Sequence, residues 1–522
     1  MERVMGIEPT SRAWEACILP MNYTRIGEGI IAKGHGKSNH FLSKAFVFAF
    51  SGKKIYNNFI FYKTEGFFMD EQEKKYKAMT EPPVEKLIGK LAVPCIISML
   101  VTSFYNMADT FFVSMLGQDT ATGAVGVVFS MMAIIQAVGF FFGQGSGTFI
   151  SRALGEKKYQ EANEMAATGF VSSLVIGGVI CLLGQIFLDP LARLLGSSET
   201  ILPYTRDYLR IILIGAPWMT ASFVLNNQLR FQGGAMYAMV GITTGAVLNI
   251  ILDPLMILPQ FMNLGVAGAG WATIISQLVS FTLLLIGCSK GSNIRIKLQN
   301  FRLKWEYYYQ IFRGGLPSLF RQSFSSLAAV TLNNVIVAKE LGDAVTAAMG
   351  VVQRISMFGA SAMIGFGQGF QPVCGFNYGA GLHDRVKKGF WFCVKVSTAI
   401  LLVIAAAGFI FAEELVGLFL DSPEAIACAT MALRFNCITF PAHGWIVMSN
   451  MMEQSMGKTL PATFLAVARQ GLFYIPLVLI LPSMLNLLGL EMTQAAADGL
   501  TLLCAIPLQI HVLKTMGKEQ KK

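Results

Sequence analysis

The sequence predicts an all-α polytopic membrane protein, with twelve transmembrane helices arranged as two parallel six-helix repeats around a central cleft. Of its 522 residues, 54% are hydrophobic and only 14% are charged, whereas an average soluble domain has about 25% charged residues. Uncharged apolar runs recur along the chain, each long enough to cross about 30 Å of hydrocarbon as a helix. An internal repeat, described below, predicts how the helices are arranged.

The apolar runs divide the chain from residue 87 onward into twelve expected spans. We expect an N-terminal lobe over 87–289, a cytoplasmic linker over 290–310, a C-terminal lobe over 311–513 and a cytoplasmic tail over 514–522. The spans of the first lobe lie near 88–114, 122–149, 165–188, 204–229, 236–258 and 264–288. Those of the second lie near 311–337, 345–373, 389–412, 425–451, 461–482 and 488–513.

Residues 1–68 do not share this pattern. They contain no apolar run long enough to span a bilayer, and they do not begin like a secretory signal. Their string GIEPTSRAWEACILPMNYTR resembles the antisense translation of a transfer-RNA gene. We therefore interpret 1–68 as a disordered tail from a mis-assigned start, with Met69 opening the product and 69–86 forming a cytoplasmic segment. A genuine disordered tail is the alternative.

A fixed offset of 224 residues links the two sets of spans. Residues 126–128 (GVV) match 350–352, residues 143–145 (GQG) match 367–369, and Pro217 matches Pro441. A register shared across six helices indicates a duplication. Because each copy has an even number of spans, both copies enter the membrane from the same side. The two repeats are therefore expected to be parallel, related by an axis along the membrane normal.

The charge balance predicts the orientation in the membrane. Lys and Arg number 41 against 31 Asp and Glu, for a net charge of +10. The basic residues gather in alternate connections, and the acidic residues gather in the others. By the positive-inside rule both termini are cytoplasmic, in a multi-pass protein of the cell membrane. This excess of basic charge belongs to loops, so no nucleic-acid partner is expected.

Missing motifs exclude several classes of function. No GxxxxGK[ST], no HExxH and no paired Cys/His cluster occurs in the sequence. We therefore predict that this chain is not an ATP-driven pump or an enzyme and that it needs no cofactor. A duplicated bundle without an energy-coupling domain is typical of a secondary transporter whose site lies between the repeats. A simple channel is disfavoured, since channels commonly close their pore with several subunits, and we expect a monomer in contact with membrane lipid.

Two aspartates lie inside apolar runs of the first repeat. Asp109 stands in FYNMADTFFV and Asp253 in LNIILDPLMI, although a charge in hydrocarbon costs about 2.5–3.5 kcal/mol on insertion scales. Both expected spans run outward, so the two carboxylates lie at similar depth. Aspartates that reach water at the outer rim are the structural alternative.

The surroundings of Asp253 favour a cation site. Asn249 precedes it by four residues and shares its helix face, and Pro254 leaves a backbone carbonyl without its donor. The second repeat does not keep these groups, which suggests a function restricted to the first repeat. We predict a site for H⁺ or Na⁺ formed by Asp109, Asn249 and Asp253, whose counterparts at the 224-residue offset are Asn333, Phe473 and Leu477.

Charged and polar residues also occur in the second repeat. Glu453 and Lys395 lie near predicted cytoplasmic ends, where solvated rim charges are expected. Deeper residues could contact substrate or could hold the fold through hydrogen bonds to carbonyls, and both alternatives stay open. The candidates for such substrate or structural roles are Arg321, Arg354, Arg469, Gln470 and Asp498.

From about Val84 to the C-terminus, the chain resembles the multidrug and toxic-compound extrusion (MATE) family, nearest its MepA/DinF-like branch. The strings that carry the resemblance in the first repeat are AVPCIISMLVTSFYNMADTFFVSMLG, FFFGQGSGTFISRALGEKKYQEA, LNIILDPLMI and NLGVAGAGWATIISQ. In the second repeat they are GLPSLFRQS, GFGQGFQPVCGFNYGAGLHDRV and ARQGLFYIPL.

This resemblance implies a secondary active exporter that moves amphipathic, mostly cationic drugs or toxins outward in exchange for H⁺ or Na⁺ by alternating access. The family's first-lobe cation site maps onto Asp109, Asn249 and Asp253, and a hydroxyl of its sixth span is similar to Thr273. A second acidic site of some members, in spans seven and ten, is matched only in part, since span seven has Asn333 and Asn334 and Glu453 stands at the end of span ten.

A lipid-linked oligosaccharide or lipid flippase of a related fold is the alternative function. Such a flippase would be expected to gather several arginines in its cleft to bind pyrophosphate. The residues that keep this alternative open are Arg321, Arg354 and Arg469.

Overall fold

The computed structural model describes residues 72–114, 119–258, 260–290, 294 and 296–516 of the chain. Lys74–Lys522 forms one compact unit. The expected tail over 1–68 and most of the expected tail over 514–522 lie outside the described residues. The predicted lobe boundaries remain predictions, because Lys74–Lys522 forms a single compact unit.

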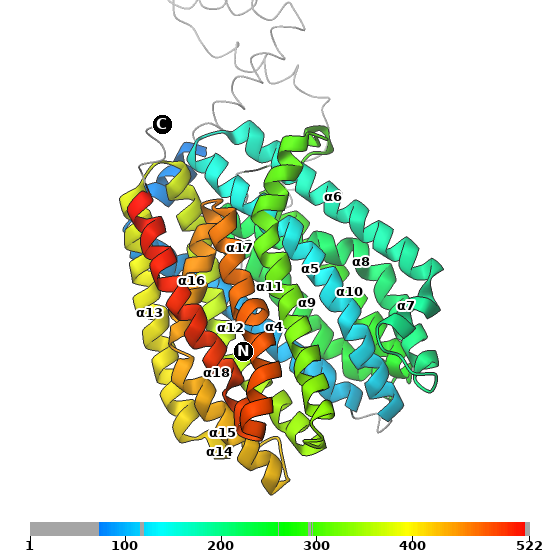
Figure 1. Cartoon of the computed structure of the whole chain (residues 1–522). Coiled ribbons are helices and arrows are strands. Elements are labelled where there is room, and N and C mark those ends of the chain that lie inside the picture. Colours follow the sequence, from blue (N-terminus) through cyan, green and yellow to red (C-terminus); the bar gives the residue numbers. More distant parts are fainter. Residues whose placement is uncertain (1–71, 115–118, 259, 291–293, 295, 517–522) are drawn as a thin grey trace, which may run out of the picture. The chain divides into compact units, whose positions relative to one another are not determined.

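Long helices make up the first half of this unit (Figure 1). Helices satisfy their own backbone hydrogen bonds, which is what a chain with such apolar segments requires in lipid. The long helices are α4 (Val84–Ser114), α5 (Asp119–Gly155), α6 (Tyr159–Ile186), α8 (Leu202–Phe231), α9 (Ala235–Ile257) and α10 (Gly265–Lys290), with the short helix α7 (Leu188–Leu194) between α6 and α8.

The second half follows a connection that contains the 3₁₀ turn η2 (Leu298–Asn300). Its last helix is interrupted at Asn486, whose φ of 51° and ψ of −128° are not helical. The elements are α11 (Trp305–Ala338), α12 (Asp343–Gly379), α13 (His383–Ile410), α14 (Ala412–Gly417), α15 (Pro423–Thr439), α16 (Ala442–Ser455), α17 (Thr459–Val467), the π-helix η3 (Ala468–Tyr474) and α18 (Ile475–Thr515).

The expected all-α polytopic fold is confirmed, and each of the twelve expected spans corresponds to helical structure. By length and hydropathy, nine helices of the described chain could cross a membrane, or ten if the bent pair α15 and α16 counts as one span. One of the nine, Thr459–Thr515, contains two expected spans that meet at Asn486. Helix α11 is long enough at 34 residues, but Arg313, Arg321 and several serines and asparagines reduce its hydropathy.

The predicted repeat is visible in the helix boundaries. Helices α5 and α12 are both 37 residues long, and α6 and α13 are both 28 residues long. Both ends of each pair differ by the 224-residue offset. A hydrogen bond repeats as well, since Nδ2 of Asn226 donates to the carbonyl of Ala238 at 3.2 Å and Nδ2 of Asn450 donates to that of Ala462 at 2.6 Å.

The two halves differ at one pair of related helices. Helix α8 runs without interruption through Pro217. Its counterpart is broken into α15 and α16, which are bent by 58° at a break that contains Pro441. A proline within a helix removes a hydrogen bond and favours a kink, so the second half has a bend that the first half lacks.

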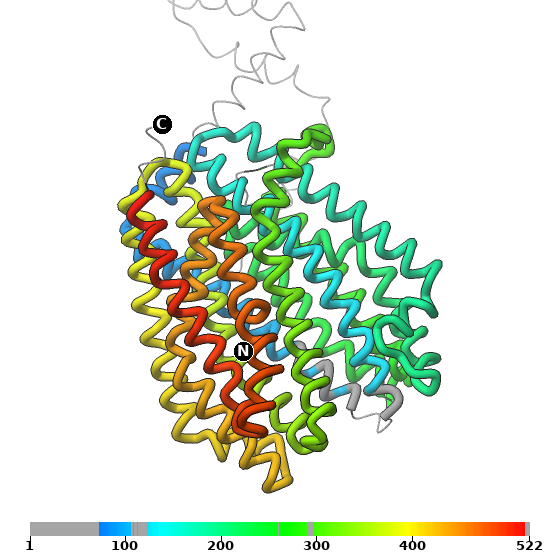
Figure 2. The backbone as a smooth tube through the Cα atoms, viewed as in Figure 1, coloured from blue at the N-terminus to red at the C-terminus, as the bar shows by residue number. Residues whose placement is uncertain are grey.

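The halves pack against each other through the first helix of each. Helix α4 packs on α12, and α11 packs on α5; Figure 2 shows α11, in green, beside α5, in cyan. Glycines of the repeated GQG motif lie at both contacts. A Cβ atom on Gly145 would lie 2.3 Å from the carbonyl oxygen of Ile311, and one on Gly369 would lie 2.4 Å from Cα of Ala92. The motif therefore permits close approach of backbones from opposite halves.

We expect Gly145→Ala and Gly369→Ala to destabilise the protein, because the added methyl group meets backbone that has little room to move. Overpacking of this kind costs about 1–3 kcal/mol. Thermal unfolding of the detergent-solubilised protein, followed by size-exclusion chromatography after heating, measures the effect. The matched controls are Gly126→Ala and Gly350→Ala, where a Cβ would meet no atom within 4 Å. Equal loss of stability in all four variants would contradict this account of the motif.

Candidate functional site

Three predicted residues of the first half form a buried polar cluster. Asn249 and Asp253 lie one turn apart on α9, and Thr273 lies on α10, which packs against α9. Nδ2 of Asn249 donates a hydrogen bond to Oδ1 of Asp253 at 3.2 Å and lies 3.5 Å from Oγ1 of Thr273. Each of the three residues is at most 2% exposed. The structure therefore brings together Asn249, Asp253 and Thr273.

Small residues hold α9 and α10 close enough for this contact. A Cβ atom on Gly245 would lie 2.8 Å from Cβ of Ser280, and one on Gly268 would lie 2.4 Å from the carbonyl oxygen of Met256. Close approach lets the hydroxyl of Thr273 reach the amide of Asn249. The apolar sequence around the cluster forms the helices, and the glycines set the distance between them.

Asp109 lies on α4, and its side chain lies outside the described part of the structure. Helix α4, which carries Asp109, packs directly against α9, which carries Asp253. The participation of Asp109 in the cluster stays a prediction.

The ligand atoms of the cluster are oxygens. They belong to a carboxylate, an amide and a hydroxyl, and Oδ1 of Asn249 has no hydrogen-bond partner among the described residues. Within the described part of the chain, no group of three His, Cys, Asp or Glu residues could hold a metal ion. A small set of hard oxygen ligands suits a proton or an alkali cation better than a transition metal.

A second buried cluster lies in the second half. Asp498 on α18 is 1% exposed, and three side chains donate to its carboxylate. Nε of Arg469 lies 2.7 Å from Oδ1, Nε2 of Gln494 lies 2.9 Å from Oδ1, and Nε2 of His443 lies 2.9 Å from Oδ2. Gln470 contacts this set through Gln494 at 3.5 Å. Three predicted residues, Arg469, Gln470 and Asp498, therefore belong to one cluster.

His443 was not identified from the sequence. It is a single histidine in an apolar span, and its partner Asp498 lies 55 residues away. An imidazole within a membrane span is nevertheless a signal, since ionisable groups are rare there and usually have a partner.

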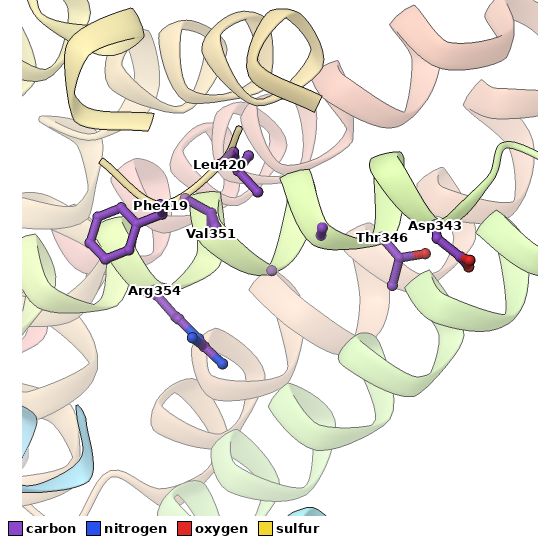
Figure 3. A pocket seen from close by; sticks show the side chains of 8 residues that line it. Asp343, Thr346, Val351, Arg354, Phe419 and Leu420 are labelled. Carbon is purple, nitrogen blue, oxygen red and sulfur yellow. The ribbon is translucent and has the colours of Figure 1, made fainter. Parts of the chain in front are cut away.

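The other predicted polar residues of the second half lie apart from this cluster. Arg321 on α11 donates from Nη1 to Oδ1 of Asn450 at 3.3 Å. Arg354 is exposed and lines a groove along α12 with Asp343, as Figure 3 shows. Arg469 contacts Asp498 instead. The three arginines have separate surroundings, which disfavours the pyrophosphate site expected of a flippase.

The expectation of a solvated rim charge at Glu453 is wrong. Glu453 on α16 is fully buried, and neither of its carboxylate oxygens has a hydrogen-bond partner in the part of the chain that the structure describes. The helix end is covered by neighbouring helices that the sequence pattern could not place. Lys395 on α13 is exposed at the surface of the helix bundle, and its position at a solvated rim stays a prediction.

Asp189, which lies between two spans, forms an ion pair at the surface with Arg206 near the start of α8. Arg206 donates from Nε to Oδ1 of Asp189 on α7 at 2.7 Å. This hydrogen bond from the guanidinium lowers the pKa of the Asp189 carboxyl. Both side chains are exposed, so the pair contrasts with that of Arg469 and Asp498, in which the carboxylate is buried and the arginine is partly exposed.

We expect Arg469→Leu to destabilise the protein by about 3 kcal/mol, because it leaves the buried carboxylate of Asp498 without its cationic partner. The double variant Arg469→Leu/Asp498→Leu should recover much of that loss, since no charge is then left uncompensated. Thermal unfolding in detergent measures both effects. Arg206→Leu, which breaks the exposed pair with Asp189, serves as the control and should change the melting temperature little. A double variant no more stable than Arg469→Leu would contradict the pairing.

Comparison with known proteins agrees with this architecture. The MatE family model matches residues 94–255 and again 317–480, together more than half of the chain. The chain is 26% identical over 433 residues to the multidrug export protein MepA of Staphylococcus aureus, covering 83% of this chain and 94% of MepA. It is 27% identical over 431 residues to MepA of Staphylococcus haemolyticus, covering 82% and 91%.

Solved structures share the fold. A crystal structure of MATE in complex with MaL6 superposes with a TM-score of 0.80 at 26% identity, covering 85% of this chain and 99% of that one. A multidrug resistance MATE family transporter of the MOP superfamily, in an outward-facing conformation, gives a TM-score of 0.80 at 25% identity with the same coverage. The repeated family match coincides with the repeat seen in the helices, and the chain is therefore a multi-pass membrane protein that belongs to the MATE family of transporters.

Proposed function

We propose that this protein exports amphipathic, mostly cationic small molecules across the cell membrane in exchange for H⁺ or Na⁺, by alternating access. The two MepA proteins to which it is similar, from Staphylococcus aureus and Staphylococcus haemolyticus, are multidrug export proteins. The observation that carries the proposal is the buried oxygen cluster of Asn249, Asp253 and Thr273 beside α4. Binding of a proton or a cation neutralises a carboxylate in that position. Because a charged and a neutral carboxylate favour different surroundings inside a membrane, ion binding is coupled to the conformation of the helices.

In the proposed exchange, Asp109 joins Asp253 as a coupled pair of carboxylates. Two neighbouring acids in a buried site titrate together, so binding of one proton or cation affects both. Helix α4 packs on α9 and also on α12 of the second half. A change at the cluster that shifts α4 therefore alters a contact between the halves, where the exported compound binds.

The available energy is sufficient for export. Electroneutral exchange of one H⁺ for a monovalent cation is driven by the pH difference alone, at about 1.4 kcal/mol or tenfold per pH unit. Export of a neutral compound also uses the membrane potential, at roughly 2.3 kcal/mol per 100 mV.

We place the basic ends of the helices and both termini in the cytoplasm. Contacts between the halves occur at those ends. Nη1 of Arg152 donates to the carbonyl of Ser455 at 2.9 Å, and Nδ2 of Asn377 donates to that of Met79 at 3.1 Å. In this orientation, the hydrogen bonds hold the cytoplasmic side of the halves together, and alternating access requires that they break.

Ethidium efflux from proteoliposomes, with pH and Na⁺ gradients imposed separately, tests the proposal. We expect efflux to follow one of the gradients and to fall at least tenfold in Asp253→Asn, because the amide cannot release a proton or neutralise a cation. Asp421→Asn, which changes an exposed aspartate, is the control and should transport like the wild type. Efflux that is indifferent to both gradients and to Asp253 would exclude the mechanism. If no ethidium moves, translocation of lipid-linked oligosaccharide should be measured next.

Thr273 should affect the affinity for the coupling ion. We expect Thr273→Val to raise the ion concentration that gives half-maximal efflux by up to about tenfold, since one hydrogen bond or oxygen ligand is lost. Thr273→Ser keeps the hydroxyl and should resemble the wild type. Equal ion dependence in the wild type, Thr273→Ser and Thr273→Val would show that the hydroxyl takes no part.

A further inference from the structure

Both oxygens of the Asp498 carboxylate accept hydrogen bonds from neighbouring side chains. Oδ1 accepts from Nε of Arg469 and Nε2 of Gln494, and Oδ2 accepts from Nε2 of His443. The negative charge is balanced by the guanidinium, so the cluster is neutral while the imidazole is neutral. A metal cation would have to displace these donors and would be repelled by Arg469, which leaves the proton as the ion this cluster can take up.

His443 is the residue of the cluster that can take up a proton. Its Nε2 faces a carboxylate and therefore carries a hydrogen, which makes Nδ1 the acceptor of the ring. The ring is buried, with the residue 4% exposed, and its centroid lies 5.1 Å from that of Phe440. Among the described residues, Nδ1 of His443 has no hydrogen-bond partner. A lone pair without a donor can accept a proton.

The charges around His443 oppose one another. The carboxylate of Asp498 contacts the ring through Oδ2, and the guanidinium of Arg469 lies on Oδ1 of the same carboxylate. Tyr474, buried on η3, is a further titratable side chain near Asp498. Asp498 favours the imidazolium, whereas Arg469 and burial oppose it. A site with opposing influences can bind a proton and also lose it.

Other helices that pack on α16 add no charge at this point. Helix α13 presents Ser397 and Thr398 next to Gly444, and its Lys395 is exposed. On α11, Arg321 contacts Asn450, two turns along α16. On α5, Arg152 contacts Ser455 at the far end of α16. On α12, Arg354 is exposed, and α17 has no titratable residue.

The backbone is irregular on both sides of the cluster. His443 is the second residue of α16, next to the break at which α15 and α16 are bent by 58°. Arg469 lies in the π-helical segment Ala468–Tyr474, and π-helical turns are frequent at functional sites. Helices α16, α17 and α18 lie side by side, in orange to red in Figure 2. A charge added at His443 therefore lies next to the bend between α15 and α16. Through Asp498 it also changes the electrostatic surroundings of Arg469 in the π-helical turn.

We propose that His443 is a proton-binding residue of the second half, which takes up H⁺ at Nδ1 and holds it as an imidazolium paired with Asp498. No other bond forms or breaks, and the cluster gains one positive charge. Asp498 lies one residue from the repeat position of Thr273, which is 497. The second half thus has a nitrogen-based proton site near the place where the first half has its oxygen cluster. The part of this proton in transport rests on the proposed function, whereas its binding does not.

Carbon NMR of the full-length protein in detergent, labelled at Cε1 of histidine, tests the proposal. The chain has five histidines, and His443→Gln identifies the signal of interest. We expect this signal to move from the neutral to the imidazolium position as the pH is lowered from 9 to 5. Asp498→Asn should move the transition to lower pH by roughly one to two pH units, because a carboxylate that stabilises the charged ring is lost.

Two further variants keep the test decisive. Arg469→Gln should move the transition to higher pH, and it can be used if Asp498→Asn does not fold. His511→Gln, which changes an exposed histidine at the end of α18, is the control and should leave the His443 signal unchanged. A His443 signal that stays neutral over the whole range overturns the proposal, as does a transition that moves in neither Asp498→Asn nor Arg469→Gln.

Ethidium efflux then separates this proposal from the proposed function. If the proton of His443 takes part in exchange, His443→Gln changes the pH dependence of efflux, whereas Asp253→Asn abolishes efflux. A titrating His443 without any efflux contradicts the proposed function alone. Efflux with a His443 that does not titrate contradicts the proton site alone.

Discussion

Compensation of buried charge is the constraint on which the arrangement of both polar clusters depends. A carboxylate in a low-dielectric interior is stable only where hydrogen-bond donors or an opposite charge surround it. Asp253 has the amide of Asn249 beside it, and Thr273 completes the cluster. Asp498 has a guanidinium, an imidazole and an amide. The first cluster surrounds its carboxylate with an amide and a hydroxyl, whereas the second pairs its carboxylate with a guanidinium.

The two halves share a helical framework but have different polar side chains. Two pairs of their helices match in length, and both halves have a hydrogen bond between an asparagine and a backbone carbonyl. On this common frame, the positions of Asn249 and Asp253 are occupied by Phe473 and Leu477 in the second half. The buried polar cluster of that half, around Asp498, lies instead on α16, η3 and α18. Helix α16 begins at the bend, and η3 is π-helical. Duplication thus conserved the packing while the polar groups diverged.

Close packing between the halves explains how a local event can have a distant effect. Glycines at the α4–α12 and α5–α11 contacts leave no space for a side chain, so the backbones of the two halves are closely packed there. Helix α4 touches α9 and α12, and it lies between the oxygen cluster and the second half. In the proposed exchange, a change at the oxygen cluster would reach the second half through α4.

The sequence by itself determined the class, the helical ranges and the repeat, because hydrocarbon thickness and backbone satisfaction leave few alternatives for long apolar runs. It also identified Asn249 and Asp253, whose shared face follows from their spacing on one helix. Only the tertiary structure decided which distant residues meet. His443 and Asp498 are 55 residues apart, and Glu453 is buried by helices that its own segment does not specify. Contacts of this kind depend on how helices cross, and crossing depends on packing of side chains from separate segments, which no local pattern contains.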